Sequence, residues 1–150
     1  MAKCLFILIA AVLAFSACDG DRSSSPGEES KLFPERYGEK GLALVEGSSD
    51  KVKLAEKMDV VLSYDYLIGM HEVTCDEYGE VSCDGAHFPV TDVTFYDAVL
   101  FANKKSKAEK FDTVYTYSSA KFDSKNHCIY LENLSASLDR AGYRLPTEAE

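Results

Sequence analysis

An apolar run near the N-terminus most limits how this chain can fold. After Met1-Ala2-Lys3, residues 4–17 (CLFILIAAVLAFSA) are apolar or small without interruption, and Asp19 follows closely. A membrane-spanning helix needs about 20 apolar residues. A short basic start, an apolar run of this length and small residues at its end are typical of a secretory leader. We therefore predict that residues 1–17 are a signal peptide, so the fold is built from later residues.

The end of this run has a pattern of small residues followed by a cysteine. Ser16-Ala17-Cys18 resembles the lipobox of bacterial lipoproteins, although Phe15 stands where that family usually has leucine. The resemblance implies that Cys18 is acylated, with palmitate among its chains, and becomes the mature N-terminus. The alternative is an ordinary signal peptide cut after Ala17. Residues 18–39 would be a flexible Ser-, Gly- and Glu-rich tether. We expect an exported protein held at a membrane on its periplasmic or cell-surface side.

Length and charge limit the remaining possibilities. The chain has 150 residues, of which 46% are hydrophobic, and this suits one globular domain after the tether. We place that domain at residues 40–150. The net charge of −9 argues against a nucleic-acid partner, because no basic stripe could neutralise phosphates.

Short-range patterns predict two helix starts. Thr74 is followed three residues later by Glu77, and Thr94 is followed by Asp97, which are capping-box arrangements. Apolar residues then recur at helical spacing from Phe95. Apolar and β-branched runs predict strands at residues 41–47, 60–68, 114–117 and 128–131.

The last four residues repeat the capping pattern. Thr147 and Glu150 form a third such pair after the extended segment 143–146, but only three residues follow Thr147. A helix that short does not persist. The sequence therefore predicts a domain truncated at its C-terminus, and a fragment of marginal stability.

Four segments together resemble the formylglycine-generating enzyme, or sulfatase-modifying factor, family. They are residues 41–47, 68–78, 89–98 (PVTDVTFYDA) and 141–150 (AGYRLPTEAE). The resemblance implies a C-type-lectin-like α+β fold with little regular secondary structure, of which this chain holds the N-terminal part. It also implies copper and structural calcium as cofactors, and no residue of this chain is assigned as a ligand of either. Because the family's catalytic cysteines follow the RLPTEAE signature, no residue of this chain is assigned a catalytic role.

The cysteines could act as structural or as metal-binding groups. Cys75 and Cys83 lie eight positions apart, and in an exported protein such a pair can oxidise to a disulfide. With His71 and His87 they would make a set of metal-ligand types, but the spacing matches no zinc pattern, so no metal site is predicted. Cys128 lies in an apolar run and is interpreted as a small core residue.

Two function classes remain open. One is an enzyme that oxidises a cysteine of a polypeptide, as the family resemblance implies. The other is a non-catalytic surface module that binds a glycan or a protein on the same scaffold. Several tyrosines could line a carbohydrate-stacking surface or pack half-buried in the fold: Tyr64, Tyr66, Tyr96, Tyr115, Tyr117 and Tyr143.

Overall fold

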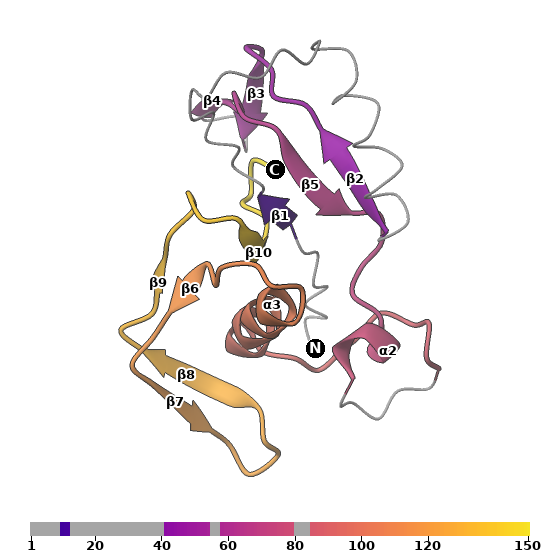
Figure 1. The fold of residues 1–150 in the computed structure, drawn as a ribbon, viewed down its shortest axis with the longest axis vertical. Helices are drawn as coiled ribbons and strands as arrows, with labels where there is room; N and C mark the ends of the chain where they lie inside the picture. The colour runs from indigo at the N-terminus through magenta and orange to yellow at the C-terminus, as the bar shows by residue number, and fades with distance from the viewer. Residues whose placement is uncertain (1–9, 13–40, 55–57, 80–84) are drawn as a thin grey trace.

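The computed structural model describes residues 10–12, 41–54, 58–79 and 85–150. Its strands are β1 (Ala10–Val12), β2 (Leu42–Val45), β3 (Lys51–Leu54), β4 (Met58–Val61), β5 (Tyr66–Gly69), β6 (Tyr115–Thr116), β7 (Ser119–Phe122), β8 (Cys128–Glu132), β9 (Ser135–Ala136) and β10 (Gly142–Arg144). Its helices are α2 (Cys75–Tyr78) and α3 (Phe95–Ala108). This mixture of helices and antiparallel strands is an α+β fold, as the sequence predicted (Figure 1).

A four-stranded antiparallel sheet brings together segments from both ends of the chain. Its strand order is β10-β1-β5-β2. Strand β1 lies between β5 and β10 (Figure 1). Ala11 of β1 is opposite Leu67 of β5 on one side and opposite Tyr143 of β10 on the other. Residues 10–12 belong to the predicted leader. Part of the segment that we expect to be removed on export thus pairs at the centre of this sheet.

Helix α3 begins at the predicted residue. The hydroxyl of Thr94 accepts a hydrogen bond from the Asp97 N–H at 3.0 Å, and the Asp97 carboxylate accepts one from the Thr94 N–H at 3.0 Å. This capping box satisfies two backbone donors that the helix itself cannot pair. Its buried apolar residues follow helical spacing: Ala98, Val99, Phe101 and Ala102. Helix α2 is capped by the same motif at Thr74, and Gly79, whose φ of 86° favours glycine, caps its C-terminal end.

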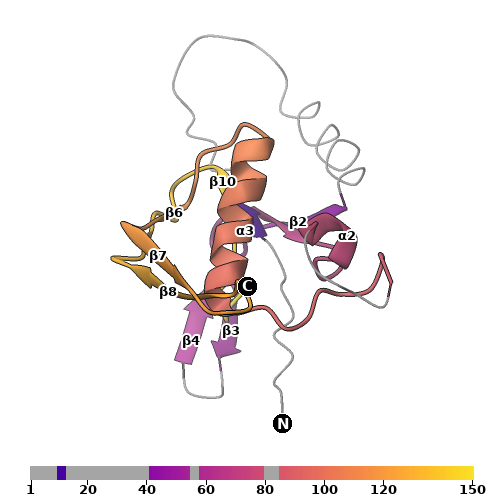
Figure 2. The same cartoon turned by 90° about the horizontal axis from the view of Figure 1, so that it is seen from below.

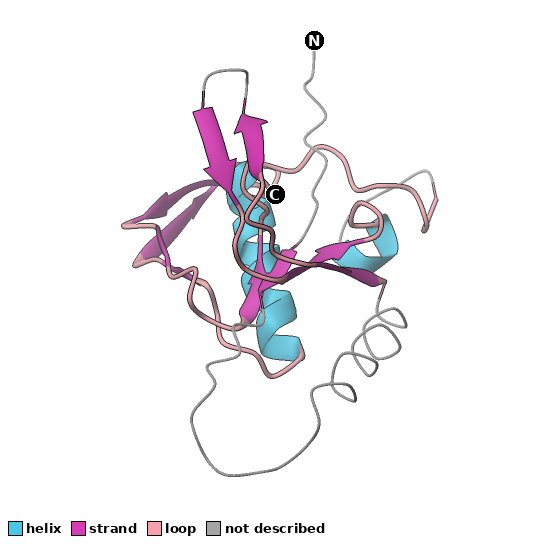
Figure 3. Cartoon of the chain, turned by 90° about the horizontal axis from the view of Figure 1, so that it is seen from above, coloured by secondary structure: helices cyan, strands magenta, loops and turns pink. Residues whose placement is uncertain are grey.

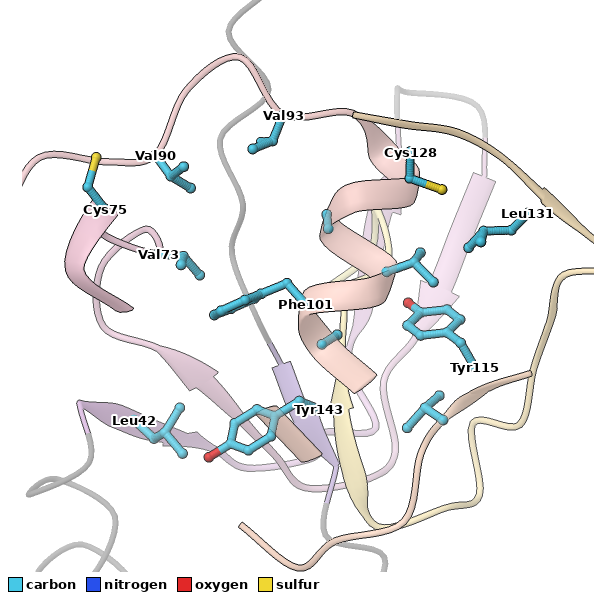
Figure 4. Packing of buried hydrophobic residues seen from close by; sticks show 14 of the residues in the cluster. Leu42, Val73, Cys75, Val90, Val93, Phe101, Tyr115, Cys128, Leu131 and Tyr143 are labelled. Atoms are coloured by element: carbon cyan, nitrogen blue, oxygen red, sulfur yellow. The ribbon is translucent and has the colours of Figure 1, made fainter. Parts of the chain in front are cut away.

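Helix α3 separates two parts of the molecule. Figure 2 shows β2 and α2 on one side of the helix and the β7–β8 hairpin on the other. In Figure 3 the β3–β4 hairpin projects away from this central region. The core fills the space around α3, with Phe101 pointing toward Val73 and α2, while Tyr115, Cys128 and Leu131 pack on the opposite face (Figure 4).

A β-bulge shapes the β7–β8 hairpin. Lys121 lies opposite Tyr130 and Phe122 opposite Cys128, so Ile129 is an extra residue on β8. Such a residue shifts the alternation of inward and outward side chains by one position. Cys128 and Leu131 are therefore both buried, while Ile129 and Tyr130, which lie between them, are both exposed.

One strand prediction is wrong in its extent. Residues 60–68 do not form a single strand, because β4 ends at Val61 and β5 begins at Tyr66. The chain between them turns back toward the end of β2. The Gly47 N–H donates to the Asp65 carboxylate at 2.8 Å, and the Ser48 N–H donates to the Leu62 carbonyl at 2.8 Å. These side-chain and turn contacts replace the ladder bonds that a continuous strand would need.

The other predicted strands are confirmed with different bounds, two of them shorter and one longer than predicted. The run 41–47 contains β2, the run 114–117 contains β6, and the run 128–131 lies within β8. Among the described residues, no helix combines the length and the apolar character that crossing a bilayer requires.

Candidate functional site

The most completely buried charges lie in the C-terminal signature segment. Arg144 of β10 is 2% exposed and forms an ion pair with Glu150, whose side chain is 0% exposed. One of the two contacts, from Arg144 Nη1 to Glu150 Oε2, measures 2.6 Å. Arg144 Nη1 also donates to the Leu145 carbonyl at 3.0 Å. Its Nε atom is buried and has no hydrogen-bond partner among the described residues.

Tyrosine hydroxyls from distant parts of the chain complete this cluster. Tyr64 donates to Glu150 Oε1 at 2.7 Å, and Tyr66 donates to the Glu150 carbonyl at 3.2 Å. The Tyr115 hydroxyl accepts the Leu145 N–H at 3.0 Å. Burial raises the pKa of all three phenols, and the negative charge of Glu150 adds to the effect. These phenols therefore act as neutral hydrogen-bonding groups.

The carboxylate of Glu150 is held in its charged form. Burial by itself would raise its pKa, but hydrogen bonds from Arg144, the Thr147 N–H and Tyr64 hold the pKa at about 2. The Thr147 N–H donates to Glu150 Oε2 at 2.8 Å, and the Glu150 N–H donates to the Thr147 hydroxyl at 3.4 Å. The predicted third capping pair is thus formed. A carboxylate with so many donors is a poor general base, so the cluster anchors the signature segment rather than moving protons.

A second polar group links α3 to the β7–β8 hairpin. Asp97 is 7% exposed, and its carboxylate accepts the Cys128 N–H at 2.7 Å. The Nδ1 atom of His127 lies 3.2 Å from the same carboxylate. The Thr94 hydroxyl contacts the Cys128 carbonyl at 2.5 Å. The start of the helix is therefore fixed to the start of β8 through the side chains of Asp97 and Thr94.

The free cysteine at this junction is not arranged for catalysis. Cys128 is 0% exposed, and burial raises the pKa of its thiol. A nucleophilic cysteine needs the thiolate and access to a substrate. The prediction that Cys128 is a small core residue is confirmed by its burial.

The described residues do not fit the copper that the family implies. They contain no group of three or more His, Cys, Asp or Glu side chains that could hold a metal ion. Cys128, the free thiol among them, lies within the core and not in an open site. We therefore assign no copper or calcium ligand and derive no reaction step from either metal.

A small pocket opens between the sheet and α3. Its lining includes Leu42, His71, Glu77, Lys105 and Tyr143, and its cavity volume is about 30 Å³. Such a space holds only a few water molecules. Its charges are already engaged, since Lys105 pairs with Glu109 at 3.2 Å and Glu77 caps α2. This pocket is too small for an organic substrate.

An apolar surface lies where α3 meets the β7–β8 hairpin. We call Phe95, Tyr96, Ile129 and Tyr130 the aromatic surface. The ring of Tyr96 contacts Phe95 at 5.6 Å and Tyr130 at 6.1 Å between centroids. Phe95 is 49% exposed, Ile129 is 51% exposed and Tyr130 is 44% exposed. Lys121 Nζ lies 5.5 Å from the Tyr130 ring centroid and adds a positive charge beside it.

Of the residues that the sequence predicts as functional or structural sites, the structure describes some and not others. Cys18 and Cys83 lie outside the described residues, so lipidation at Cys18 and the Cys75–Cys83 disulfide stay predictions. Cys75 lies in α2, is 7% exposed and is disulfide-bonded. The predicted tyrosines do not share one surface. Tyr66, Tyr115 and Tyr143 are buried, whereas Tyr64 and Tyr117 are exposed.

Sequence reasoning missed both buried polar clusters. The capping patterns indicated Asp97 and Glu150 as local helix-start residues, and both do form those bonds. Nothing in the sequence indicated that Asp97 also binds the backbone of Cys128 or that Glu150 also pairs with Arg144 and Tyr64. The signal that could have suggested a buried pair is an arginine and a glutamate six positions apart within one signature segment.

The fold and the site define an α+β domain whose signature segment is fixed by a buried ion pair. Residues 69–150 match the sulfatase-modifying factor enzyme 1-like domain, and the chain belongs to this family. This confirms the resemblance found in the sequence.

A curated relative adds a different indication. The chain is 32% identical over 157 aligned residues to a protein named Chaperone protein LppX from Paenibacillus barcinonensis. The alignment covers 97% of this chain and 51% of that protein, so the chain spans about half the length of this relative. No solved structure matches the chain.

Proposed function

We propose that this chain is an exported protein, anchored to a membrane by acyl chains on Cys18, whose domain binds polypeptides without catalysing a reaction. The observation that carries the proposal is the similarity of almost the whole chain to a protein named a chaperone. The leader-like residues 1–17 and the tether 18–39 support the export part. The C-type-lectin-like architecture belongs to the same proposal, since it rests on the family resemblance.

The aromatic surface is the part of the described chain best suited to hold a partly unfolded polypeptide. The large rigid rings of Phe95 and Tyr130 are exposed to solvent. When a client binds, such rings bury much apolar area at a low cost in side-chain entropy. The ring of Tyr96 supports both of them from the side. Apolar side chains of an unfolded client can bind such a surface, whereas a folded client hides them.

A second candidate is favoured by family membership. The protein would then oxidise a cysteine of a polypeptide, as the family resemblance implies. This alternative predicts copper binding and peptide oxidation, whereas the binding proposal predicts neither. A glycan is the other ligand class for the non-catalytic module, because aromatic rings also stack on sugars.

The client-binding part is tested by the aggregation of a thermally unfolding protein, followed by light scattering. We expect the wild-type chain to suppress aggregation and the Phe95→Ser/Tyr130→Ser variant to lose most of this effect. Leu138→Ser is the matched control, because Leu138 is 53% exposed but lies outside the aromatic surface. Equal suppression by all three proteins, or none by the wild type, contradicts the proposal. Glycan-array binding in place of suppression would favour the glycan module.

The anchoring part is tested separately. Cells that express the full chain are labelled with a radioactive or clickable fatty acid and then fractionated. We expect label in the membrane-bound protein and none in a Cys18→Ser variant. Label that persists in the variant, or protein that stays in the cytosol, would contradict the predicted anchor.

A further inference from the structure

The space between β5 and β10, which β1 occupies in this structure, has the form of a binding site for one extended strand. Strand β1 is antiparallel to both neighbours, with Ala10 opposite Arg144, Ala11 opposite Tyr143 and Val12 opposite Gly142. On its other side, Ala10 lies opposite Ile68 and Ala11 opposite Leu67. Both neighbouring strands therefore present edges to this short segment (Figure 1).

The backbone groups that face β1 can be assigned from the alternation of an antiparallel ladder. Successive residues of a strand point their N–H and C=O groups to opposite sides. The Met70 N–H donates to the Gly41 carbonyl, so Met70 and Ile68 face β2, and Leu67 faces β1. The Tyr143 N–H donates to the Ser106 hydroxyl at 2.8 Å, which directs this residue away from β1.

By the same alternation, Gly142 and Arg144 turn their backbone groups toward β1. The site therefore presents paired donors and acceptors from Leu67 on one side and from Gly142 and Arg144 on the other. Leu67 and Arg144 are each 2% exposed, and Gly142 is buried. Buried backbone groups of this kind need a hydrogen-bonding partner.

Removal of the leader would empty this site. Residues 10–12 lie within the predicted signal peptide 1–17, so the processed protein would lose β1 while it keeps β5 and β10. The two facing edges would then be open to another extended chain. This reasoning rests on the proposed function, because it assumes export with cleavage before Cys18.

We propose that the site between β5 and β10 accepts an extended apolar segment of a client polypeptide once the leader has been removed. A polypeptide strand is the ligand that supplies alternating N–H and C=O groups to two edges at once, which a sugar or an acyl chain does not. The segment seated there in this structure reads Ala10-Ala11-Val12, so the fitting client segment is short, small and apolar. Main-chain bonds supply the affinity, and the small residues set the preference.

The same geometry keeps the precursor closed. In the full chain the leader is tethered to the domain, so its effective concentration at the site is high and a free segment competes poorly. Cleavage converts this intramolecular strand into a dissociable one. Client binding is thereby coupled to processing.

The test uses a peptide of residues 7–14 (ILIAAVLA) with flanking lysines and a fluorophore, followed by fluorescence anisotropy. The protein is the full chain with a protease site inserted before Cys18, measured before and after cutting. We expect binding at least tenfold tighter after cutting. A peptide with proline at the Ala11 position should bind at least tenfold more weakly, because it lacks the N–H that faces Leu67.

Hydrogen exchange of the cut protein locates the site. The peptide should slow exchange in the segments that contain Leu67 and Gly142. Equal binding before and after cutting, or binding without protection of these segments, would overturn the proposal. So would a cut chain that binds no peptide because a second copy fills the site, which size-exclusion chromatography would reveal.

A second variant keeps the test valid if the cut chain unfolds. Ala11→Pro in the uncut chain should loosen β1 and admit the peptide, whereas Ala2→Pro, outside β1, should not. Failure of Ala11→Pro to admit the peptide would count against the proposal.

The two proposals can fail separately. If the client and anchoring assays fail while the peptide still binds this site, the proposed function is wrong and the strand site stands. If those assays succeed without peptide binding, only the strand site falls.

Discussion

Replacing Glu150 with glutamine should destabilise the domain strongly at neutral pH. The change keeps the size of the side chain but leaves the charge of Arg144 buried without its partner. Breaking a buried pair in this way costs about 3–5 kcal/mol. The pKa of Glu150 points to the same order of magnitude, because it is about 2 in the fold against an ordinary value of 4.5 and Arg144 is the main cause of this lowering. At 1.36 kcal/mol for each pKa step, this difference corresponds to about 3 kcal/mol.

The pH dependence of this loss follows from the sign of the shift. The pKa of Glu150 is lower in the folded state than in the unfolded state. Its contribution to stability is therefore fully present above about pH 4.5 and is lost as the pH falls toward about 2. Glutamine does not titrate, so the stability gap between the wild type and Glu150→Gln should narrow over this window.

The assay is urea unfolding of both proteins at several pH values between 7 and 2.5, with the midpoint and slope compared. Asp59→Asn is the control, because Asp59 pairs with Lys51 at 3.5 Å on the surface and should cost less than about 1 kcal/mol. The double variant Arg144→Met/Glu150→Gln should recover part of the loss, since it removes the unpaired charge. A loss below 1 kcal/mol for Glu150→Gln, or a gap that does not change with pH, would refute the reasoning.

Three further changes test other parts of the structure. Gly142→Ala should destabilise the domain by about 1–3 kcal/mol, because the new Cβ would lie 2.1 Å from the Asp112 carbonyl oxygen; a thermal midpoint equal to that of the wild type would contradict this. Asp97→Ala should lower the free energy of unfolding in urea by about 2–3 kcal/mol, because Asp97 also accepts the buried Cys128 N–H. Glu77→Ala, in the solvent-exposed capping box of α2, should lower it by about 1 kcal/mol or less. Equal losses would show that the contact between Asp97 and Cys128 does not stabilise the fold. A maleimide should modify Cys128 only in denaturant, and rapid labelling of the native chain, traced to this residue by mass spectrometry, would show that the thiol is accessible.

The predictions that succeeded depend on short stretches of chain. The starts of α2 and α3 follow from Thr74 with Glu77 and from Thr94 with Asp97, because a capping box needs only residues three positions apart. The apolar spacing after Phe95 likewise fixes which face of α3 is buried, whatever covers it. The error at residues 60–68 arose from the same reliance on local pattern, since the break there depends on a contact between Asp65 and Gly47.

The candidate site was predictable only in part for the same reason. Glu150 could be identified as a capping residue, but its pairing with Tyr64 joins residues that are 86 positions apart. Three of the six tyrosines predicted to line a surface or to pack half-buried are in fact buried in the fold. An aromatic residue in a short strand has the same local pattern whether it faces solvent or the core. Only the packing of the neighbouring elements distinguishes the two.

The sequence by itself determined the family, the helix starts, the acidic charge and a leader-like N-terminus. Each of these depends on composition or on residues close together in the chain. The tertiary structure decided which distant segments meet. It placed Ala10–Val12 between β5 and β10, buried Arg144 with Glu150, and tied Asp97 to the backbone of Cys128. The physical reason is that backbone pairing and buried charge depend on the partner across the fold, which no local pattern of residues specifies.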